Sequence, residues 1–173
     1  VGGGVRSIQN IQNLLKAGAD KVSINSAAIK DPNIIKSSSK YFGSQCIVVA
    51  VDVKKDKGSW KVYSYGGTKN TNIDAVDWLK KIEDLGAGEI LLTSMDKDGT
   101  KSGFDLEVLS RANDILSIPV IASGGVGSIE HFYDGVKTGK ADALLAASVF
   151  HFNEFSIMDV KNYLKEKNIE VRI

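Results

Sequence analysis

Two stretches of the chain repeat a pattern of small residues that could hold phosphate groups. The first copy runs from Val1 to Ala27 and the second from Ala122 to Val149, and they align with one extra residue, Lys140, in the second. Each copy has a glycine pair after one short apolar run and a small or hydroxyl-bearing residue after the next. Glycines let backbone N–H groups approach a ligand closely, and the start of a following helix favours negative charge. The repeat therefore predicts two phosphate sites built on two copies of one supersecondary unit.

Two aspartates follow predicted strands and could transfer protons. Asp52 comes directly after the apolar run 47–51, where a carboxylate is costly unless it faces a polar cavity or a partner. We therefore expect Asp52 to line a cavity. Asp98 follows the predicted strand 89–94 and is a second candidate, although an Asp-Gly turn with a capping role would also explain it.

The composition excludes several classes of protein. The 173 residues are 43% hydrophobic and 25% charged with a net charge of +1, which fits one folded core and gives no basic face for nucleic acid or a membrane surface. No apolar run approaches the roughly 20 residues that span a bilayer. The single cysteine, Cys46, makes no disulfide framework, so we expect a soluble, cytoplasmic protein. His131 and His151 are expected to be solvated or capping, and we predict no metal and no cofactor.

Short apolar runs alternate with amphipathic stretches, which predicts parallel strands joined by crossover helices. The first predicted strand ends at Val1, and the others cover 21–25, 47–53, 89–94, 119–123 and 143–147. The predicted helices cover 7–17, 31–42, 72–85, 105–116, 128–138 and 158–167, with Ser7 as a cap and left-handed ends at Gly18, Gly86 and Gly139. A hairpin is expected about Lys57-Gly58. No linker divides the chain, so residues 1–173 are predicted to form a single domain.

This rhythm fits either an open doubly wound sheet or part of an eight-stranded barrel, and a complete barrel typically needs about 250 residues. The blocks 1–4, 20–28, 42–45, 51–54, 86–94, 96–103 and 123–125 decide between the two, because their order and spacing resemble the cyclase subunit of imidazole glycerol phosphate synthase, from histidine biosynthesis. The resemblance implies an α/β (β/α)8 TIM-type barrel, here incomplete and covering strands three to eight. The first two strand-helix units of the family have no counterpart in this sequence. We therefore expect an N-terminal segment to exist in nature, or neighbouring chains to cover the gap.

The resemblance also implies a reaction and a set of residues. Ammonia would react with a ribulosyl-amine substrate carrying two phosphates, closing an imidazole ring and releasing an aminoimidazole carboxamide ribotide. Asp52 matches the general acid on the family's fifth strand, whereas the catalytic aspartate of the first strand has no counterpart here. The expected substrate and phosphate residues are Gly4, Asn25 and Ser26 for one phosphate, Gly99, Gly125, Ala147 and Ser148 for the other, and Gly66, Asn70, Thr93, Asp98 and Ser123 elsewhere in the pocket.

Charged residues at the amino ends of the predicted strands, opposite to the predicted phosphate sites, suggest a second function. Lys21 and Glu89 begin their strands, so they should lie together at the N-terminal mouth. In the family these positions match a ring of charges that guards the channel for ammonia from a separate glutaminase subunit, and Asp20 matches a position near that interface. A plain surface salt bridge, worth about 1 kcal/mol or less, explains Lys21 and Glu89 equally well.

Three hypotheses for the function remain open at this stage. The first is the cyclase. The second is a related enzyme on the same half-barrel plan, either a sugar isomerase of histidine biosynthesis, which the block 98–103 disfavours, or an amidotransferase-linked synthase for surface glycans. The third is a non-catalytic remnant that binds phosphates or a partner. Because the first-strand aspartate is missing, we predict no detectable turnover from this chain alone.

Overall fold

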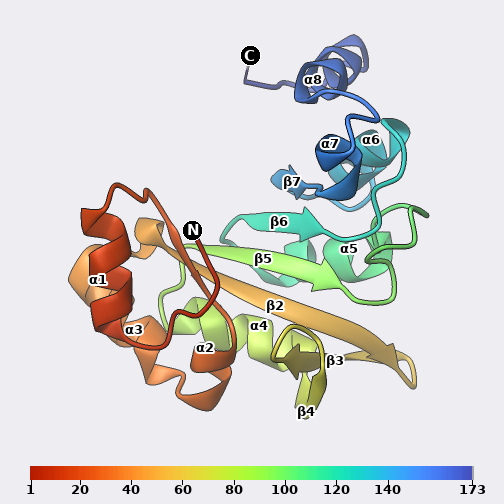
Figure 1. Cartoon of the computed structure of the whole chain (residues 1–173). Helices are drawn as coiled ribbons and strands as arrows, with labels where there is room; N and C mark the ends of the chain where they lie inside the picture. Colours follow the sequence, from red (N-terminus) through yellow and green to blue (C-terminus); the bar gives the residue numbers. More distant parts are fainter. Residues whose placement is uncertain (173) are drawn as a thin grey trace.

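A mixed sheet of seven strands forms the centre of the computed structural model, which describes residues 1–172 (Figure 1). The strands are β1 (Val22–Ile24), β2 (Ile47–Asp56), β3 (Ser59–Ser64), β4 (Lys69–Asp74), β5 (Glu89–Ser94), β6 (Val120–Ser123) and β7 (Ala143–Leu145). Their order is β4-β3-β2-β5-β6-β7, and β1 pairs with β2 beside that path. β1, β2, β5, β6 and β7 run parallel, as the sequence predicted, whereas β3 and β4 extend the sheet as an antiparallel hairpin.

Strand β2 organises the sheet because it pairs with three other strands. Its first residues, 47–49, pair with β1, and residues 52–56 pair with β3 on the same edge. Residues 48–53 pair with β5 on the other edge. Within residues 1–172 no pairing joins β7 to β1, so the sheet of this chain is open. The mixed α/β class and the largely parallel sheet are confirmed, and closure into a barrel stays a prediction.

Helices connect the parallel strands, and half of those in residues 1–172 begin at a side-chain cap. They are α1 (Ile8–Lys16), α2 (Ser26–Lys30), α3 (Asn33–Phe42), α4 (Ala75–Asp84), α5 (Leu106–Ile115), α6 (Glu130–Lys137), α7 (Ser148–His151) and α8 (Ile157–Glu166). Ser7, Asp74 and Asp105 each accept a hydrogen bond from a backbone N–H in the first turn of α1, α4 and α5. The predicted cap at Ser7 is therefore confirmed. None of the helices within residues 1–172 is both long and apolar enough to cross a membrane.

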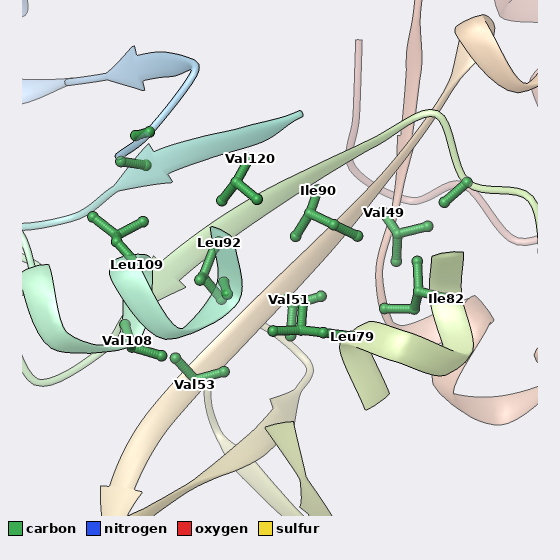
Figure 2. Packing of buried hydrophobic residues seen from close by; sticks show 14 of the residues in the cluster. Val49, Val51, Val53, Leu79, Ile82, Ile90, Leu92, Val108, Leu109 and Val120 are labelled. Carbon is green, nitrogen blue, oxygen red and sulfur yellow. The ribbon is translucent and has the colours of Figure 1, made fainter. Parts of the chain in front are cut away.

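One face of the sheet is buried under helices. Alternate residues of β2 and β5 point to this face, as the two-residue period of a strand requires. Figure 2 shows them packed with side chains of α4 and α5, and the labelled residues are Val49, Val51, Val53, Leu79, Ile82, Ile90, Leu92, Val108, Leu109 and Val120. Burying each such side chain stabilises the fold by about 1.5–3 kcal/mol, so this layer fixes the strands that carry the polar residues of the other face.

The other face of the sheet is less buried and includes polar side chains. Paired residues of neighbouring strands share a face, which places Ala50 and Asp52 of β2 with Leu91 and Thr93 of β5. These four side chains are half-buried, and Leu145, at the end of β7, is 41% exposed. Polar and apolar residues thus line a partly open face, which we call the open face.

The two copies of the sequence repeat fold alike. In the first, Gly2 forms a parallel bridge to Ser23 of β1, and the chain continues through α1, β1 and the short helix α2. In the second, β6 leads through α6 and β7 to the short helix α7. Both glycine pairs, 3–4 and 124–125, have positive φ angles. The predicted duplication of one supersecondary unit is therefore confirmed, and its copies lie at opposite margins of the sheet.

Some elements differ from the prediction. Helices α2 and α7 and strand β4 were not predicted, because each is short and lacks an apolar period of its own. Gly18 and Gly86 adopt positive φ angles after their helices as expected, but the prediction for Gly139 was wrong, since Lys140 adopts the left-handed conformation there with φ 59°. A side chain at Gly139 would lie 2.7 Å from the carbonyl oxygen of Gly135, so close packing explains this glycine instead.

Candidate functional site

A row of polar side chains crosses the sheet near the carboxyl ends of the parallel strands. Asp52 of β2 pairs in register with Thr93 of β5, and Thr93 pairs with Ser123 of β6. Because residues in register share a face, all three side chains belong to the open face, and all three are half-buried. The structure thus brings together three of the predicted site residues from segments far apart in the sequence.

Asp52 lies in an environment that favours its protonated form. Its Oδ2 atom accepts a hydrogen bond from Nδ2 of Asn25 at 3.0 Å. Burial raises the pKa of the Asp52 carboxyl above its ordinary value, the hydrogen bond from Asn25 opposes that rise, and the negative charge of Asp98 adds to it. A carboxyl group with a raised pKa can donate a proton closer to neutral pH, as a general acid must.

The loop after β5 folds over the second glycine pair. The backbone N–H of Asp98 donates to the carbonyl of Ser94 at 2.9 Å, and the N–H of Gly103 donates to the carbonyl of Gly125 at 2.8 Å. A Cβ atom at Gly124 would lie 3.3 Å from Cβ of Asp98. The loop that contains Asp98 and Gly99 is therefore held at the carboxyl end of β6, beside the row that includes Ser123.

The close approach of this loop explains why position 125 is glycine. Gly125 has a φ angle of 101°, and a Cβ atom there would lie only 2.2 Å from the carbonyl oxygen of Gly103. The equivalent glycine of the first copy, Gly4, has a φ angle of 69° but nothing within 4 Å of a Cβ position. The glycines of the two predicted phosphate sites thus both have positive φ angles, but within residues 1–172 only Gly125 is packed against a neighbouring loop.

Asn25 and Ser26 follow β1 at the same end of the sheet. The side chain of Asn25 is bonded to Asp52, and Oγ of Ser26 accepts a hydrogen bond from the backbone N–H of Tyr65 at 2.9 Å. Tyr65 begins the glycine-rich tip of the β3–β4 hairpin, which includes Gly66 with a φ angle of 64°. This tip is therefore anchored beside the first copy of the repeat.

The remaining predicted pocket residues lie at other positions along the same end of the sheet. Asn70 pairs with Tyr63 of β3, and Tyr63 pairs with Asp52, so Asn70 lies two strands away from the carboxyl group. Ala147 and Ser148 follow β7, where the carbonyl of Ala147 accepts a hydrogen bond from the N–H of His151 at 2.9 Å. They occupy the same place in the second copy that Asn25 and Ser26 occupy in the first.

The predicted charged pair lies at the amino end of the open face. Lys21 precedes β1 and Glu89 begins β5, and the two side chains form an ion pair. Strand β2 lies between them, since Val22 pairs with Ile47 and Val48 pairs with Glu89. Asp20, next to Lys21, is exposed. The expectation that Lys21 and Glu89 lie together is met, and a role as a gate stays a prediction.

The structure confirms the expected capping role of His131, and one contributor to the site, Tyr65, was not predicted. Nδ1 of His131 accepts hydrogen bonds from the backbone N–H groups of Gly127 at 3.0 Å and Ser128 at 3.2 Å, which fixes the turn after the second glycine pair. Tyr65, described above, anchors the hairpin tip. The sequence signal for His131 is its spacing, three and four residues after the N–H groups that it caps. Within residues 1–172 no three His, Cys, Asp or Glu side chains are grouped as a metal site.

Comparison with known protein families gives a match to most of this sequence. A model of the family described as histidine biosynthesis protein matches residues 1–156, which cover both copies of the repeat, Asp52, the loop around Asp98 and the ion pair. The match covers most of the chain and includes every residue of the candidate site. The chain therefore belongs to the family of histidine biosynthesis proteins.

Proposed function

We propose that this chain is part of the cyclase subunit of imidazole glycerol phosphate synthase. In this reaction ammonia adds to a bisphosphorylated ribulosyl-amine, an imidazole ring closes to give imidazole glycerol phosphate, and an aminoimidazole carboxamide ribotide leaves. The observation that carries the proposal is the position of Asp52. It lies on the open face, in register with Thr93 and Ser123, between the two copies of the repeat.

Asp52 is proposed as the general acid. Ring closure and release of the ribotide require a proton donor, and a half-buried carboxyl group with a raised pKa supplies one. The opposing proton acceptor is proposed to lie in the segment that the family carries before this one. Residues 1–173 alone are therefore expected to give no detectable turnover.

The two copies of the repeat are proposed to bind the two phosphates. Gly4 and Gly125 follow parallel strands at the same end of the sheet, on opposite sides of Asp52. Both residues are glycines with positive φ angles, and the lack of a Cβ atom lets a ligand approach their backbone closely. A substrate with a phosphate at each end would then present its middle to the carboxyl group.

A glutaminase subunit is the proposed partner, and ammonia is proposed to enter at the amino end of the open face. The ion pair of Lys21 with Glu89 lies there. Asp52 lies four residues further along β2 than the residue paired with Glu89, or about 13 Å at the rise of a strand. Ammonia that passed the ion pair would thus reach the proposed acid along one face.

The test is an assay of the complete natural protein with the ribulosyl-amine substrate and an ammonium salt, in which formation of the imidazole product is followed. Asp52→Asn should lower kcat by about 100-fold or more, because it removes the proton donor. Asp56→Asn is the matched control: it lies on the same strand, is exposed, and should leave kcat unchanged. Isomerisation of a sugar without uptake of ammonia would identify the related isomerase and overturn the proposal.

A further inference from the structure

The side chain of Asn25 is held in an unusual way. Its Nδ2 atom donates to Oδ2 of Asp52 at 3.0 Å, and this is the hydrogen bond that the amide makes. Its Oδ1 atom is buried and has no partner within residues 1–172. A buried acceptor without a partner destabilises a fold by about 1–3 kcal/mol. The amide is thus kept in place at a cost, with its donor directed at the carboxyl group.

The backbone on both sides of Asn25 is fixed by other contacts. The carbonyl of Asn25 accepts hydrogen bonds from the N–H groups of Ala28 at 2.8 Å and Ile29 at 3.2 Å, in the first turn of α2. The next residue, Ser26, is bonded to Tyr65 in the hairpin tip at 2.9 Å. The amide is therefore presented from a rigid backbone between β1 and α2.

We propose that Asn25 is the positioning residue of Asp52: its amide fixes Oδ2 and so turns the other carboxyl oxygen toward the open face, where the proton is delivered. This inference rests on the proposed function of Asp52 and adds a role for the side chain of Asn25 that is separate from phosphate binding. Oδ1 of Asp52 takes no hydrogen bond from residues 1–172, so that oxygen is available to a substrate.

The charges around Asp52 make the amide important. Asp98, in the loop after β5, faces it with a negative charge. On the open face, Tyr63 of β3 pairs directly with Asp52, and Lys54 and Lys61 follow toward the hairpin. Lys21 and Glu89 form their ion pair at the far end. Asn25 donates the hydrogen bond that stabilises the charged carboxylate, so its removal leaves burial and Asp98 unopposed.

A titration of Asp52 in the complete natural protein tests the proposal and does not depend on turnover. The 13C resonance of the Asp52 carboxyl group, assigned with Asp52→Asn, is followed against pH. Asn25→Ala should raise the midpoint by about half a pH unit or more, because the donor is lost. Asn25→Asp has the same shape with no amide donor, and it should raise the midpoint of the coupled pair further.

The matched control is Asn113→Ala. Asn113 also bonds through Nδ2, to the carbonyls of Leu109 at 3.0 Å and Gly139 at 3.2 Å, and it lies on α5 away from Asp52. Its replacement should leave the Asp52 midpoint unchanged. An unchanged midpoint in Asn25→Ala, or an equal shift in Asn113→Ala, would overturn the proposal. In the complete protein, Asn25→Ala should lower kcat about tenfold with KM within about twofold, because binding is kept and orientation is lost.

Failure of this proposal and failure of the proposed function give different results. If the carboxyl titration responds to Asn25 but the complete protein forms no imidazole product, Asn25 positions Asp52 for another reaction and the cyclase assignment fails. If product forms normally in Asn25→Ala and the titration is unchanged, the cyclase assignment stands and the positioning role of Asn25 is wrong.

Discussion

Lys21 and Glu89 form an ion pair across strand β2, on the same face of the sheet that carries Asp52 nearer the carboxyl end. The Lys21 side chain is 46% exposed and the Glu89 side chain 18%. Such a pair stabilises a fold by only about 1 kcal/mol or less. Its contribution to stability is therefore small, and the proposed gate depends on where the pair lies rather than on its strength.

Lys21→Ala tests whether this residue acts in the passage of ammonia or in the cyclisation step. In the complete protein with the proposed glutaminase partner, the variant should retain cyclisation with added ammonium salt and lose most of the activity driven by glutamine. The reason is that the pair lies far from Asp52 but on the proposed path of ammonia. Parallel measurements with the two nitrogen sources check this, and equal losses in both would defeat the gate hypothesis.

The pH dependence of stability should reveal the raised pKa of Asp52. The folded carboxyl keeps its proton to a higher pH than the unfolded one, so folding loses stability as the pH rises from the ordinary value through the raised value. Asp52→Asn removes that loss, and the variant should gain stability relative to the wild type across this window and keep the gain at neutral pH. Urea denaturation between about pH 3 and pH 7 measures it. A constant difference between the two proteins would contradict it.

Gly125→Ala should disrupt the packing of the loop after β5 against the second glycine pair. A Cβ atom there meets the carbonyl oxygen of Gly103 at 2.2 Å and also forces a side chain into a positive φ angle. Gly4→Ala is the control, since it has the positive φ angle without the clash. We expect Gly125→Ala to lower the free energy of unfolding by about 1–3 kcal/mol more than Gly4→Ala, as determined by urea denaturation. Equal effects would show that the loop moves aside freely.

Glu83 should stabilise the fold at pH values above the pKa of its carboxyl group in the folded protein. Its carboxylate accepts hydrogen bonds from the N–H and Oγ of Ser117 at 2.7 and 2.6 Å and from the N–H of Ile118 at 3.2 Å. Burial raises the pKa of Glu83, but these bonds outweigh it and hold that pKa below its ordinary value. Because the folded pKa is depressed, this stability is present at neutral pH and is lost as the pH falls through the folded value.

Glu83→Ala should lower the free energy of unfolding at neutral pH by about 1–3 kcal/mol, since it leaves the N–H groups before β6 without their acceptor. Thermal denaturation at neutral and acidic pH measures the effect. The difference from the wild type should shrink in acid. A difference that does not change with pH would mean that the charge of Glu83 plays no part.

Much of the fold could be predicted from the sequence where local pattern and packing agree. The apolar run before Asp52 and the alternation in β5 predicted two central strands to within a few residues, because their side chains supply the core. The strand β4 could not be predicted, since Lys69–Asp74 is polar and depends on pairing with β3. Helices α2 and α7 are too short for a helical period and depend on the turns at the sheet edge.

The candidate site was predictable as a set of residues but not as a set of contacts. Strand ends and glycine pairs predicted that Asp52 and Gly125 lie at the carboxyl ends of their strands, whereas Gly66, Asn70 and Thr93 were expected at the site from the family resemblance alone. The bond of Asn25 to Asp52 joins residues 27 positions apart, and the bond of Tyr65 to Ser26 joins residues 39 apart. Such contacts depend on tertiary packing, which spacing along a sequence does not record.

The unequal cover of the two glycine pairs has a consequence for how this protein can change over generations. Gly125 is pressed against a neighbouring loop, so that half of the duplication tolerates few replacements. Within this chain no atom lies within 4 Å of a Cβ position at Gly4, so its φ angle of 69° is what favours glycine there. A side chain at position 125 therefore meets both a steric and a conformational barrier within this chain, whereas one at position 4 meets the conformational barrier.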